Sequence, residues 1–269
     1  MKIKAAEHRS DDWPVTDLSG KVVLITGGAR GIGLMMAEGF VRAGAEVFLT
    51  SRKAQDCAEA AVHLSALGPV AALAHDVSAD EGRAAIVKDL LARTDRMDVL
   101  VNNAGTTWGA AIDDYPPAAF DRVWSVNVKA VFGMTQALLP LLTVGATKRD
   151  PARVINIGSV DGLRPPSSDN FAYSSSKSAS HMLTRHMAAK LAPRSITVNA
   201  IAPGPFPTKM MSFVFNDETA SSALTESVPL GSVGEPKDIA ALATFLAGPG
   251  ARWMTGSIIS LDGGRGLTS

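Results

Sequence analysis

The chain contains only one cysteine, Cys57, in 269 residues. An internal disulfide or a thiolate metal cluster needs more than one cysteine, so the sequence excludes both. It also lacks an excess of charge, because 26 Lys and Arg residues balance 26 Asp and Glu residues. Without net charge, no long-range field attracts the protein to nucleic acid or to an anionic membrane. We therefore expect a cytoplasmic protein that binds no nucleic acid.

Long hydrophobic runs are absent as well. No stretch approaches about 18 consecutive apolar residues, so we expect no membrane insertion. Residues 1–18 lack the apolar run of a secretory signal and are predicted to form an N-terminal arm on the domain surface. The five histidines form no His-Glu-x-x-His pattern, so no metal site is expected.

Short runs rich in β-branched residues alternate with helical segments along the chain. The runs are apolar on both faces, which is typical of parallel strands covered by helices on both sides. We therefore predict a single doubly wound α/β domain over residues 19–269, with a seven-stranded parallel sheet and a lid at about 205–230. The predicted strands are 21–26, 45–50, 70–74, 98–101, 153–157, 196–201 and 257–261, and the predicted helices are 31–43, 55–67, 80–93, 118–142, 171–192 and 236–247.

A glycine-rich turn, "TGGARGIG" (26–33), joins the first strand to the first helix. Such a turn lets the backbone approach a pyrophosphate at a helix N-terminus. The spacing of Gly27, Gly31 and Gly33 differs from the commoner G-x-G-x-x-G, and a turn used only for close packing is the alternative. Its position on the first strand favours a dinucleotide site.

The second strand ends in "TSRK" (50–53), where an NAD site usually carries an acidic residue. Ser51 and Arg52 stand there instead, and Arg30 lies in the glycine turn. Two cations suit a 2′-phosphate, so NADP(H) is favoured over NAD(H). The alternative is that both arginines are ordinary solvated surface groups.

Polar turns follow the next two strands, "HDVS" (75–78) and "VNNAG" (101–105). Ligands of open α/β sheets bind at the carboxyl ends of the strands. Asp76 is therefore expected to accept a hydrogen bond from the adenine amine. The backbone from Asn103 to Gly105 is expected to lie against the adenine ribose.

These motifs are joined by "VNV" (126–128), "IGS" (157–159), "YSSSK" (173–177) and "PG" (203–204). In order and approximate spacing they resemble the short-chain dehydrogenase/reductase family, from about Leu18 to Gly264. The resemblance implies a one-domain Rossmann-like fold with three layers, a nicotinamide cofactor, no metal, and a homodimer or homotetramer, of which we expect the tetramer. "NNAGTTWGAA", "ALLPLL", "PARVINIGSV" and "IAPGPFPTKM" look most like 3-oxoacyl-[acyl-carrier-protein] reductases of the rhamnolipid-biosynthesis type.

By this resemblance the catalytic residues are Asn127, Ser159, Tyr173 and Lys177. Residues four apart share one helix face, so the Lys177 ammonium can lie beneath the Tyr173 phenol and, aided by the positive nicotinamide of the oxidised cofactor, lower its pKa. Tyr173 would then act as acid in carbonyl reduction or as base in alcohol oxidation. Ser159 would hold the substrate oxygen, and the Asn127 amide could hold a water that links Lys177 to solvent.

The resemblance also places Pro203 to Thr208 over the nicotinamide, followed by the lid. Methionines in the lid would line a pocket for an acyl chain, or would instead pack the lid on the body or on another subunit. The predicted cofactor-binding residues are Gly27, Arg30, Gly31, Ile32, Gly33, Ser51, Arg52, Asp76, Val77, Asn103, Ala104, Gly105, Tyr173, Lys177, Pro203, Gly204, Phe206 and Thr208. The candidate substrate contacts are Trp108, Ser159, Asp161, Arg164, Met210 and Met211, of which the charged pair favours a polar group on the substrate.

The leading hypothesis is an NADP(H)-dependent oxidoreductase that interconverts a carbonyl and a secondary alcohol, with a 3-oxoacyl thioester as the first candidate substrate. A dehydrogenase of sugar acids, polyols or other secondary alcohols is the alternative among enzymes. A dinucleotide-sensing protein without turnover is possible on the same fold. The complete set of four predicted catalytic residues argues against a sensor, which needs no proton transfer.

Overall fold

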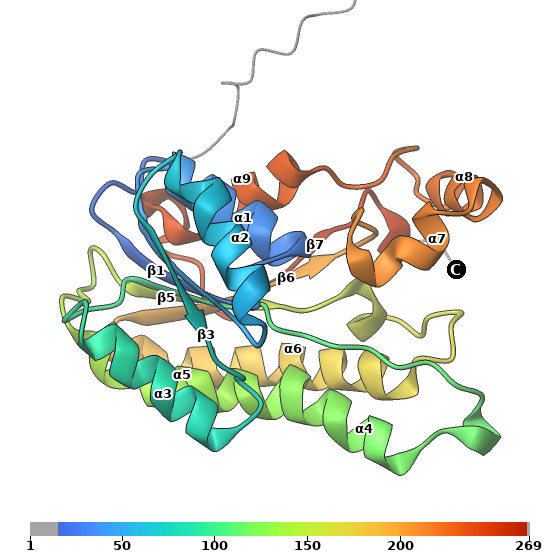
Figure 1. Ribbon diagram of the computed structural model, residues 1–269, viewed down its shortest axis with the longest axis horizontal. Coiled ribbons are helices and arrows are strands. Elements are labelled where there is room, and N and C mark those ends of the chain that lie inside the picture. The colour runs from blue at the N-terminus through green and yellow to red at the C-terminus, as the bar shows by residue number, and fades with distance from the viewer. Residues whose placement is uncertain (1–15, 268–269) are drawn as a thin grey trace, which may run out of the picture.

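The computed structural model describes residues 16–267 (Figure 1). Its centre is a sheet of parallel strands in the order β3-β2-β1-β4-β5-β6-β7. Strands β1 to β3 extend to one side and β4 to β7 to the other, so the order reverses between β1 and β4. The strands are β1 Val22–Thr26, β2 Glu46–Ser51, β3 Val70–Ala74, β4 Val99–Asn102, β5 Ala152–Ile157, β6 Ile196–Pro203 and β7 Ile258–Leu261.

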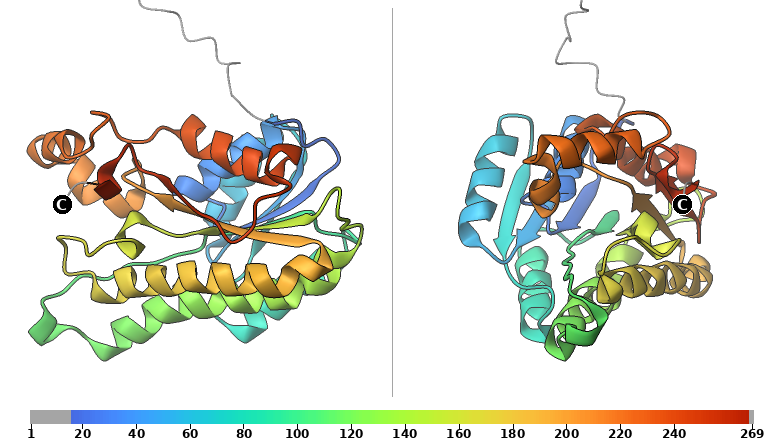
Figure 2. Two further views of the ribbon diagram at one scale, coloured as in Figure 1. Left: turned by 180° about the vertical axis from the view of Figure 1, so that it is seen from behind. Right: turned by 90° about the vertical axis from the view of Figure 1, so that its right-hand side faces the viewer.

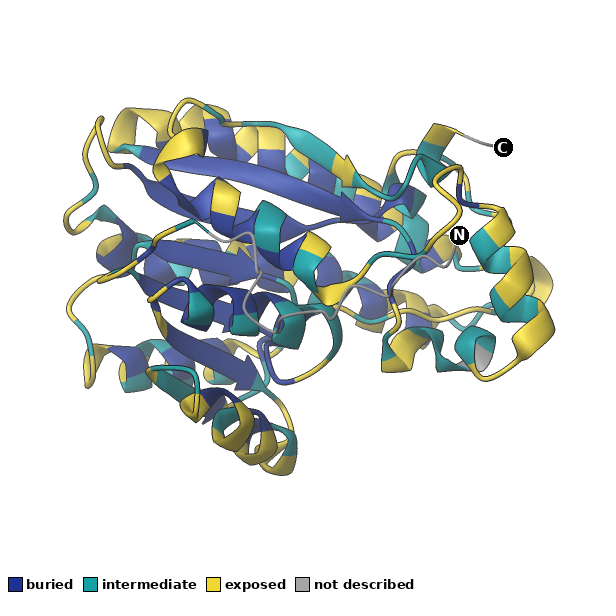
Figure 3. Cartoon of the chain, turned by 90° about the horizontal axis from the view of Figure 1, so that it is seen from above, coloured by how far each residue is buried: buried dark blue, intermediate teal, exposed yellow. Residues whose placement is uncertain are grey.

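Helices cover both faces of the sheet (Figures 1 and 2). Helices α1, α2 and α9 lie on one face, and α3, α5 and α6 lie on the other, so the chain forms three layers. Each face has its own hydrophobic core, and the strands between them appear as a buried band in Figure 3. The helices are α1 Gly31–Arg42, α2 Ala54–Ser65, α3 Asp80–Leu91, α4 Pro117–Trp124, α5 Ala130–Thr143, α6 Phe171–Leu191, α7 Ser212–Phe215, α8 Glu218–Glu226 and α9 Pro236–Ala247.

The predicted α/β fold with seven parallel strands is confirmed. Of the predicted arm, residues 1–15 lie outside the described residues. Two helices, α7 and α8, were not predicted, and both lie in the segment expected to be the lid. Helix α8 is short and has Leu224 as its one large apolar residue, and it begins where the Asp217 side chain accepts a hydrogen bond from the Ala220 N–H.

The predicted helix at 118–142 consists of three parts. Between α4 and α5 lies a short π-helical segment, η2, at Ser125–Lys129. By length and mean hydropathy, the whole run from Pro117 to Thr143 could cross a bilayer. Its inner face, however, packs in the core below the sheet, where Met134 and Leu138 are almost fully buried. Core helices of globular proteins meet the same criterion.

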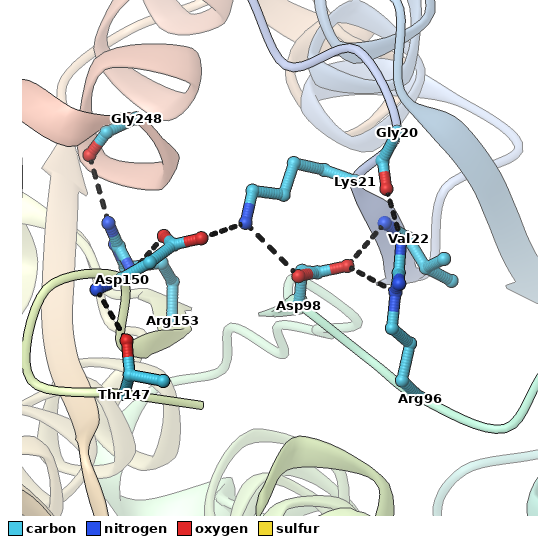
Figure 4. Close-up of polar contacts among 9 residues, drawn as sticks. All are labelled: Gly20, Lys21, Val22, Arg96, Asp98, Thr147, Asp150, Arg153 and Gly248. Carbon is cyan, nitrogen blue, oxygen red and sulfur yellow. Dashed lines mark hydrogen bonds and ion pairs between the residues drawn. The ribbon is translucent and has the colours of Figure 1, made fainter. Parts of the chain in front are cut away.

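An ionic network joins the amino ends of β1, β4 and β5 (Figure 4). Lys21 Nζ lies 3.2 Å from Asp98 Oδ1 and 2.5 Å from Asp150 Oδ2. Asp150 also pairs with Arg153, whose guanidinium donates to the Gly248 carbonyl at 3.2 Å. Burial lowers the pKa of Arg153, whereas the nearby carboxylates of Asp150 and Asp98 raise it. The network therefore links these three strands at their amino ends.

Candidate functional site

A cavity of about 530 Å³ lies at the carboxyl ends of the strands. Every residue predicted to bind the cofactor lines it, together with Ser159 and Met210. The sequence analysis missed some of its lining: Thr50, His75, Thr106, Thr107, Arg122, Val126, Ile157, Gly158 and Lys209. Because segments far apart in the chain converge here, the structure brings the predicted cofactor and catalytic motifs to one site.

The glycine turn forms one wall of the cavity between β1 and α1. Gly27 and Gly31 have φ angles of 64° and 54°, which favour glycine over any other residue. A Cβ at Gly33 would collide with the Gly27 carbonyl. Asn103 holds the turn from β4, because its amide donates to the carbonyls of Thr26 and Gly27 at 2.9 and 3.0 Å. The turn therefore leaves the first N–H groups of α1 beside the cavity, an arrangement that fits a pyrophosphate.

Two arginines lie at the end of the cavity next to β2. Arg30 Nη1 is 3.8 Å from Asp56 Oδ2, and Arg52 Nη1 is 4.0 Å from Asp76 Oδ2. Both arginine side chains are 55% exposed, so neither is enclosed by its carboxylate partner. The other oxygen of Asp76 accepts hydrogen bonds from the N–H and hydroxyl of Ser78. These cations, with no acidic residue at the end of β2, fit an additional phosphate group.

Tyr173 and Lys177 lie one helical turn apart on α6. Lys177 Nζ is 5.6 Å from the centre of the Tyr173 ring and donates to the Ile157 carbonyl at 2.7 Å. Ser159 follows β5, and its hydroxyl accepts a hydrogen bond from the Asp161 N–H at 3.1 Å and hydrogen-bonds with Tyr173. The carboxyl end of β5 and the amino-terminal part of α6 thus bring the Ser159 hydroxyl, the Tyr173 phenol and the Lys177 ammonium group to one corner of the cavity.

Burial dominates the acid–base properties of this corner. It raises the pKa of Tyr173 to about 12, where the hydrogen bond with Ser159 acts in the opposite direction and the Asp161 carboxylate adds to the rise. Burial also lowers the pKa of Lys177 to about 8. Without a cofactor the pKa of Tyr173 is thus raised, with loss of hydration as the largest cause. The lowering expected from Lys177 together with the positive nicotinamide of a bound cofactor stays a prediction.

Asn127 lies in the π-helical segment, just outside the cavity lining. Its amide group donates to the Thr106 carbonyl at 3.0 Å and to the Ser176 hydroxyl at 2.9 Å, and its oxygen accepts from the Thr106 N–H at 2.9 Å. Both amide hydrogens are thus used within the protein. Only a lone pair of the amide oxygen remains for the water that the sequence led us to expect. Ser176 was not predicted to have a role.

Four of the candidate substrate contacts are not among the residues that line the cavity: Trp108, Asp161, Arg164 and Met211. The Asp161 carboxylate accepts a hydrogen bond from the Asn170 amide at 3.0 Å, which fixes it to the loop before α6. Arg164 Nε is buried without a hydrogen-bond partner in the described part of the chain. Two cations, Arg122 and Lys209, line the cavity instead. Lys209 adjoins the predicted Thr208, whereas no sequence signal marked Arg122.

A buried histidine, His181, lies on α6 one turn after Lys177. Within residues 16–267 neither ring nitrogen forms a hydrogen bond of standard geometry, and the weaker contact with the Gly162 backbone acts to raise the pKa of the imidazole. The ring occupies space left by two glycines that flank Ser159: a Cβ at Gly158 would collide with it, and one at Gly162 would lie 2.9 Å from Cε1. Burial, and next the Lys177 charge, lower the pKa of His181 to about 4. His181 is therefore a neutral side chain that supports the Ser159 turn.

The described residues contain no group of three or more His, Cys, Asp or Glu side chains that could hold a metal ion. The predicted chemistry of the site relies on Ser159, Tyr173 and Lys177, none of which is a member of such a group.

Comparisons with known proteins agree with this site. A family model described as enoyl-(acyl carrier protein) reductase matches residues 27–265. A rhamnolipids biosynthesis 3-oxoacyl-[acyl-carrier-protein] reductase from Pseudomonas aeruginosa is 45% identical over 251 residues, which cover 93% of this chain and 98% of that protein. A 5-keto-D-gluconate 5-reductase from Escherichia coli is 33% identical over 258 residues, covering 92% and 96%.

Among solved structures, the Pseudomonas aeruginosa RhlG/NADP active-site complex matches with a TM-score of 0.92 and 45% identity. The match covers 94% of this chain and 99% of that chain. Sequence and fold thus agree over almost the whole length. The chain belongs to the short-chain dehydrogenase/reductase family of oxidoreductases.

Proposed function

We propose that the protein is an NADP(H)-dependent reductase that converts the keto group of a 3-oxoacyl thioester into a secondary alcohol. The observation that carries the proposal is one continuous cavity, which joins the glycine turn and two arginines to Ser159, Tyr173 and Lys177. The 45% identical Pseudomonas aeruginosa reductase, matched over nearly its full length, supports the choice of substrate.

In this proposal the glycine turn holds the pyrophosphate, and Arg30 and Arg52 hold the 2′-phosphate. Asp76, Val77 and the backbone at Asn103–Gly105 hold the adenosine, while Lys177 and the segment 203–208 hold the nicotinamide ribose and carboxamide. When bound, NADPH supplies a hydride to the carbonyl carbon of the substrate. The predicted cofactor-binding residues among these all line the cavity, which is the support for assigning them these roles.

The remaining chemistry belongs to side chains of the protein. The Ser159 hydroxyl donates a hydrogen bond to the carbonyl oxygen and stabilises the negative charge that develops on it. Tyr173 donates the proton that completes the alcohol. Because its pKa is raised to about 12, Tyr173 carries that proton at neutral pH. In the reverse direction, alcohol oxidation requires the phenol to lose this proton first.

The substrate chain is proposed to leave the reacting corner beneath the segment at 205–230. Met210 and Lys209 line the cavity there, and α7 and α8 continue the segment. A flexible apolar side chain beside a cation suits an acyl chain that ends in an anionic carrier. We include this lid with the catalytic domain of residues 19–269, preceded by an arm at 1–18.

We also propose that the protein is a cytoplasmic homotetramer that does not insert into membranes. Strand β7 lies at one edge of the sheet and is only partly buried. Phe132 on α5 and Met182 on α6 are 47% and 62% exposed. A second subunit would cover these groups. Size-exclusion chromatography with light scattering tests the assembly, and a monomeric mass would overturn it.

The function is tested by following NADPH consumption with a 3-oxoacyl thioester, a keto sugar acid and simple ketones. We expect the thioester to have the highest kcat/KM, and Tyr173→Phe to lose activity by orders of magnitude while NADPH still binds. Near-normal turnover by Tyr173→Phe would refute the mechanism. A preference for the keto sugar acid would favour the alternative enzyme, and tight NADPH binding without turnover would favour a sensor.

A further inference from the structure

An acidic residue on α2 lies next to one of the two arginines of the cavity. Asp56 is the third residue of α2, and its Oδ2 atom is 3.8 Å from Arg30 Nη1. This oxygen is buried and accepts no hydrogen bond from any described residue. Arg30 lines the cavity, whereas Asp56 is not part of its lining. Asp56 therefore acts on a cofactor through its charge rather than by direct contact.

Within residues 16–267, the Asp56 carboxylate has no partner at hydrogen-bond distance. Helix α2 begins after Lys53 without a side-chain cap, so Asp56 Oδ2 does not bind the free N–H groups of the first turn. The carboxylate lies in that turn, where it also opposes the partial positive charge of the helix terminus. The Asp56 charge also raises the pKa of the neighbouring Cys57 thiol, although burial raises it more. Both the cation and the helix terminus that could attract a phosphate are thus partly neutralised by one residue.

We propose that Asp56 is a specificity-determining residue that weakens binding of NADPH relative to NADH. The inference rests on the proposed NADP(H) site. The carboxylate offsets the charge of Arg30 and repels a 2′-phosphate held by that arginine, whereas NADH has no phosphate at this position. The protein then retains NADPH preference through Arg52, but with a smaller margin than two unopposed arginines would provide.

The opposite effect would arise if Asp56 held Arg30 in the orientation that binds phosphate. A clamp of that kind requires short, directed hydrogen bonds, as in bidentate arginine–carboxylate pairs. The separation of 3.8 Å exceeds hydrogen-bond length, and the Arg30 side chain is 55% exposed. The repulsion therefore outweighs any gain from orientation.

The test measures the Kd of NADPH and of NADH for the full-length wild type and for Asp56→Asn, by titration of nucleotide fluorescence. We expect the Asp56→Asn variant to bind NADPH about three to ten times more tightly and NADH within about twofold of the wild type, with the gain shrinking at high salt. Glu59→Gln is the matched control. Glu59 is exposed one turn further along α2, where it accepts a hydrogen bond from Gln55, and its loss should change neither Kd.

A second pair of variants tests whether Asp56 acts on NADPH through Arg30. In an Arg30→Met background, Asp56→Asn should give less than half of its gain in NADPH affinity, because the neutralised cation is gone. Weaker NADPH binding by Asp56→Asn, equal changes for both nucleotides, or no change would each overturn the inference. These results differ from failure of the proposed NADP(H) site, in which the wild type itself would not bind NADPH, and from failure of the proposed reaction, in which NADPH would bind without turnover.

Discussion

The Ser176 hydroxyl accepts a hydrogen bond from the Asn127 amide at 2.9 Å, which joins the catalytic helix α6 to the π-helical segment. The same hydroxyl donates to the Tyr173 carbonyl at 2.7 Å, and Ser176 is completely buried. One serine of the "YSSSK" motif thus helps to set the orientation of Asn127. The neighbouring Ser175 is exposed and donates only to carbonyls of its own helix.

Replacing Ser176 by alanine should therefore reduce kcat more than it affects nucleotide binding. We expect Ser176→Ala to lower kcat about three- to tenfold, with the KM for NADPH within about twofold, because one of the hydrogen bonds of Asn127 is lost. Ser175→Ala should behave like the wild type. Steady-state kinetics of Ser176→Ala, Asn127→Ala and the double variant provide the check, and fully additive losses would contradict a link between the two residues.

The Asp161 carboxylate raises the pKa of Tyr173, so its neutralisation should lower that pKa. In the oxidative direction Tyr173 must be deprotonated, and the rate rises as the pH passes through its pKa. Asp161→Asn is expected to move the rising limb of the pH–rate profile for alcohol oxidation to lower pH. Asp169→Asn, on the same loop and exposed, is the control. An unmoved limb in Asp161→Asn would show that this carboxylate does not influence the phenol.

Gly158 has no room for a side chain, because a Cβ there would collide with the His181 ring. The Gly158→Ala variant should push the Ser159 turn out of position and reduce kcat/KM by about a hundredfold. Removing the obstacle should restore part of the activity. We expect the double variant Gly158→Ala/His181→Ala to be more active than Gly158→Ala, and an equal or lower activity would disprove a steric cause.

His181 should make the protein sensitive to mild acid. Its pKa is about 4 in the folded protein and near its ordinary 6.5 when unfolded. Between these values the unfolded chain binds more protons, so stability falls as the pH drops from about 6.5 to about 4, by up to about 3 kcal/mol. Urea unfolding at about pH 7.5 and about pH 4.5 should show a smaller acid loss for His181→Leu than for wild type.

The matched control for this acid loss is His186→Leu, which replaces an exposed histidine on the same helix and should keep the wild-type difference between the two pH values. If His181→Leu and wild type lost the same stability, another group would have to be responsible.

Much of the fold and of the cofactor site could be predicted because both follow from local patterns. Strands that are apolar on both faces define the sheet, and Ser51, Asp76 and Asn103 could be identified because each lies at or just after the carboxyl end of a strand. Arg122 could not be identified, because it reaches the cavity from α4, whose amphipathic pattern is that of an ordinary helix. Helices α7 and α8, at 212–226, are too short for a periodic pattern of apolar residues to be recognised.

The raised pKa of Tyr173 in the unliganded protein was not predicted from the sequence. The sequence places Lys177 four residues away, but it carries no information on how far either side chain is removed from water. Burial depends on the whole fold, and here it is the largest cause of the pKa shifts of both groups. The roles of Ser176 and His181 depend in the same way on contacts between distant segments.

The π-helical segment at Ser125–Lys129 has a consequence for how this region tolerates change. One residue advances an α-helix by about 100°, so the wider turn sets α4 and α5 at different rotational phases about a shared axis. Deleting a single residue there would restore a regular helix and turn all of α4 relative to α5. Arg122 would then rotate away from the cavity as one rigid body with the rest of α4, although no residue that lines the cavity had been replaced.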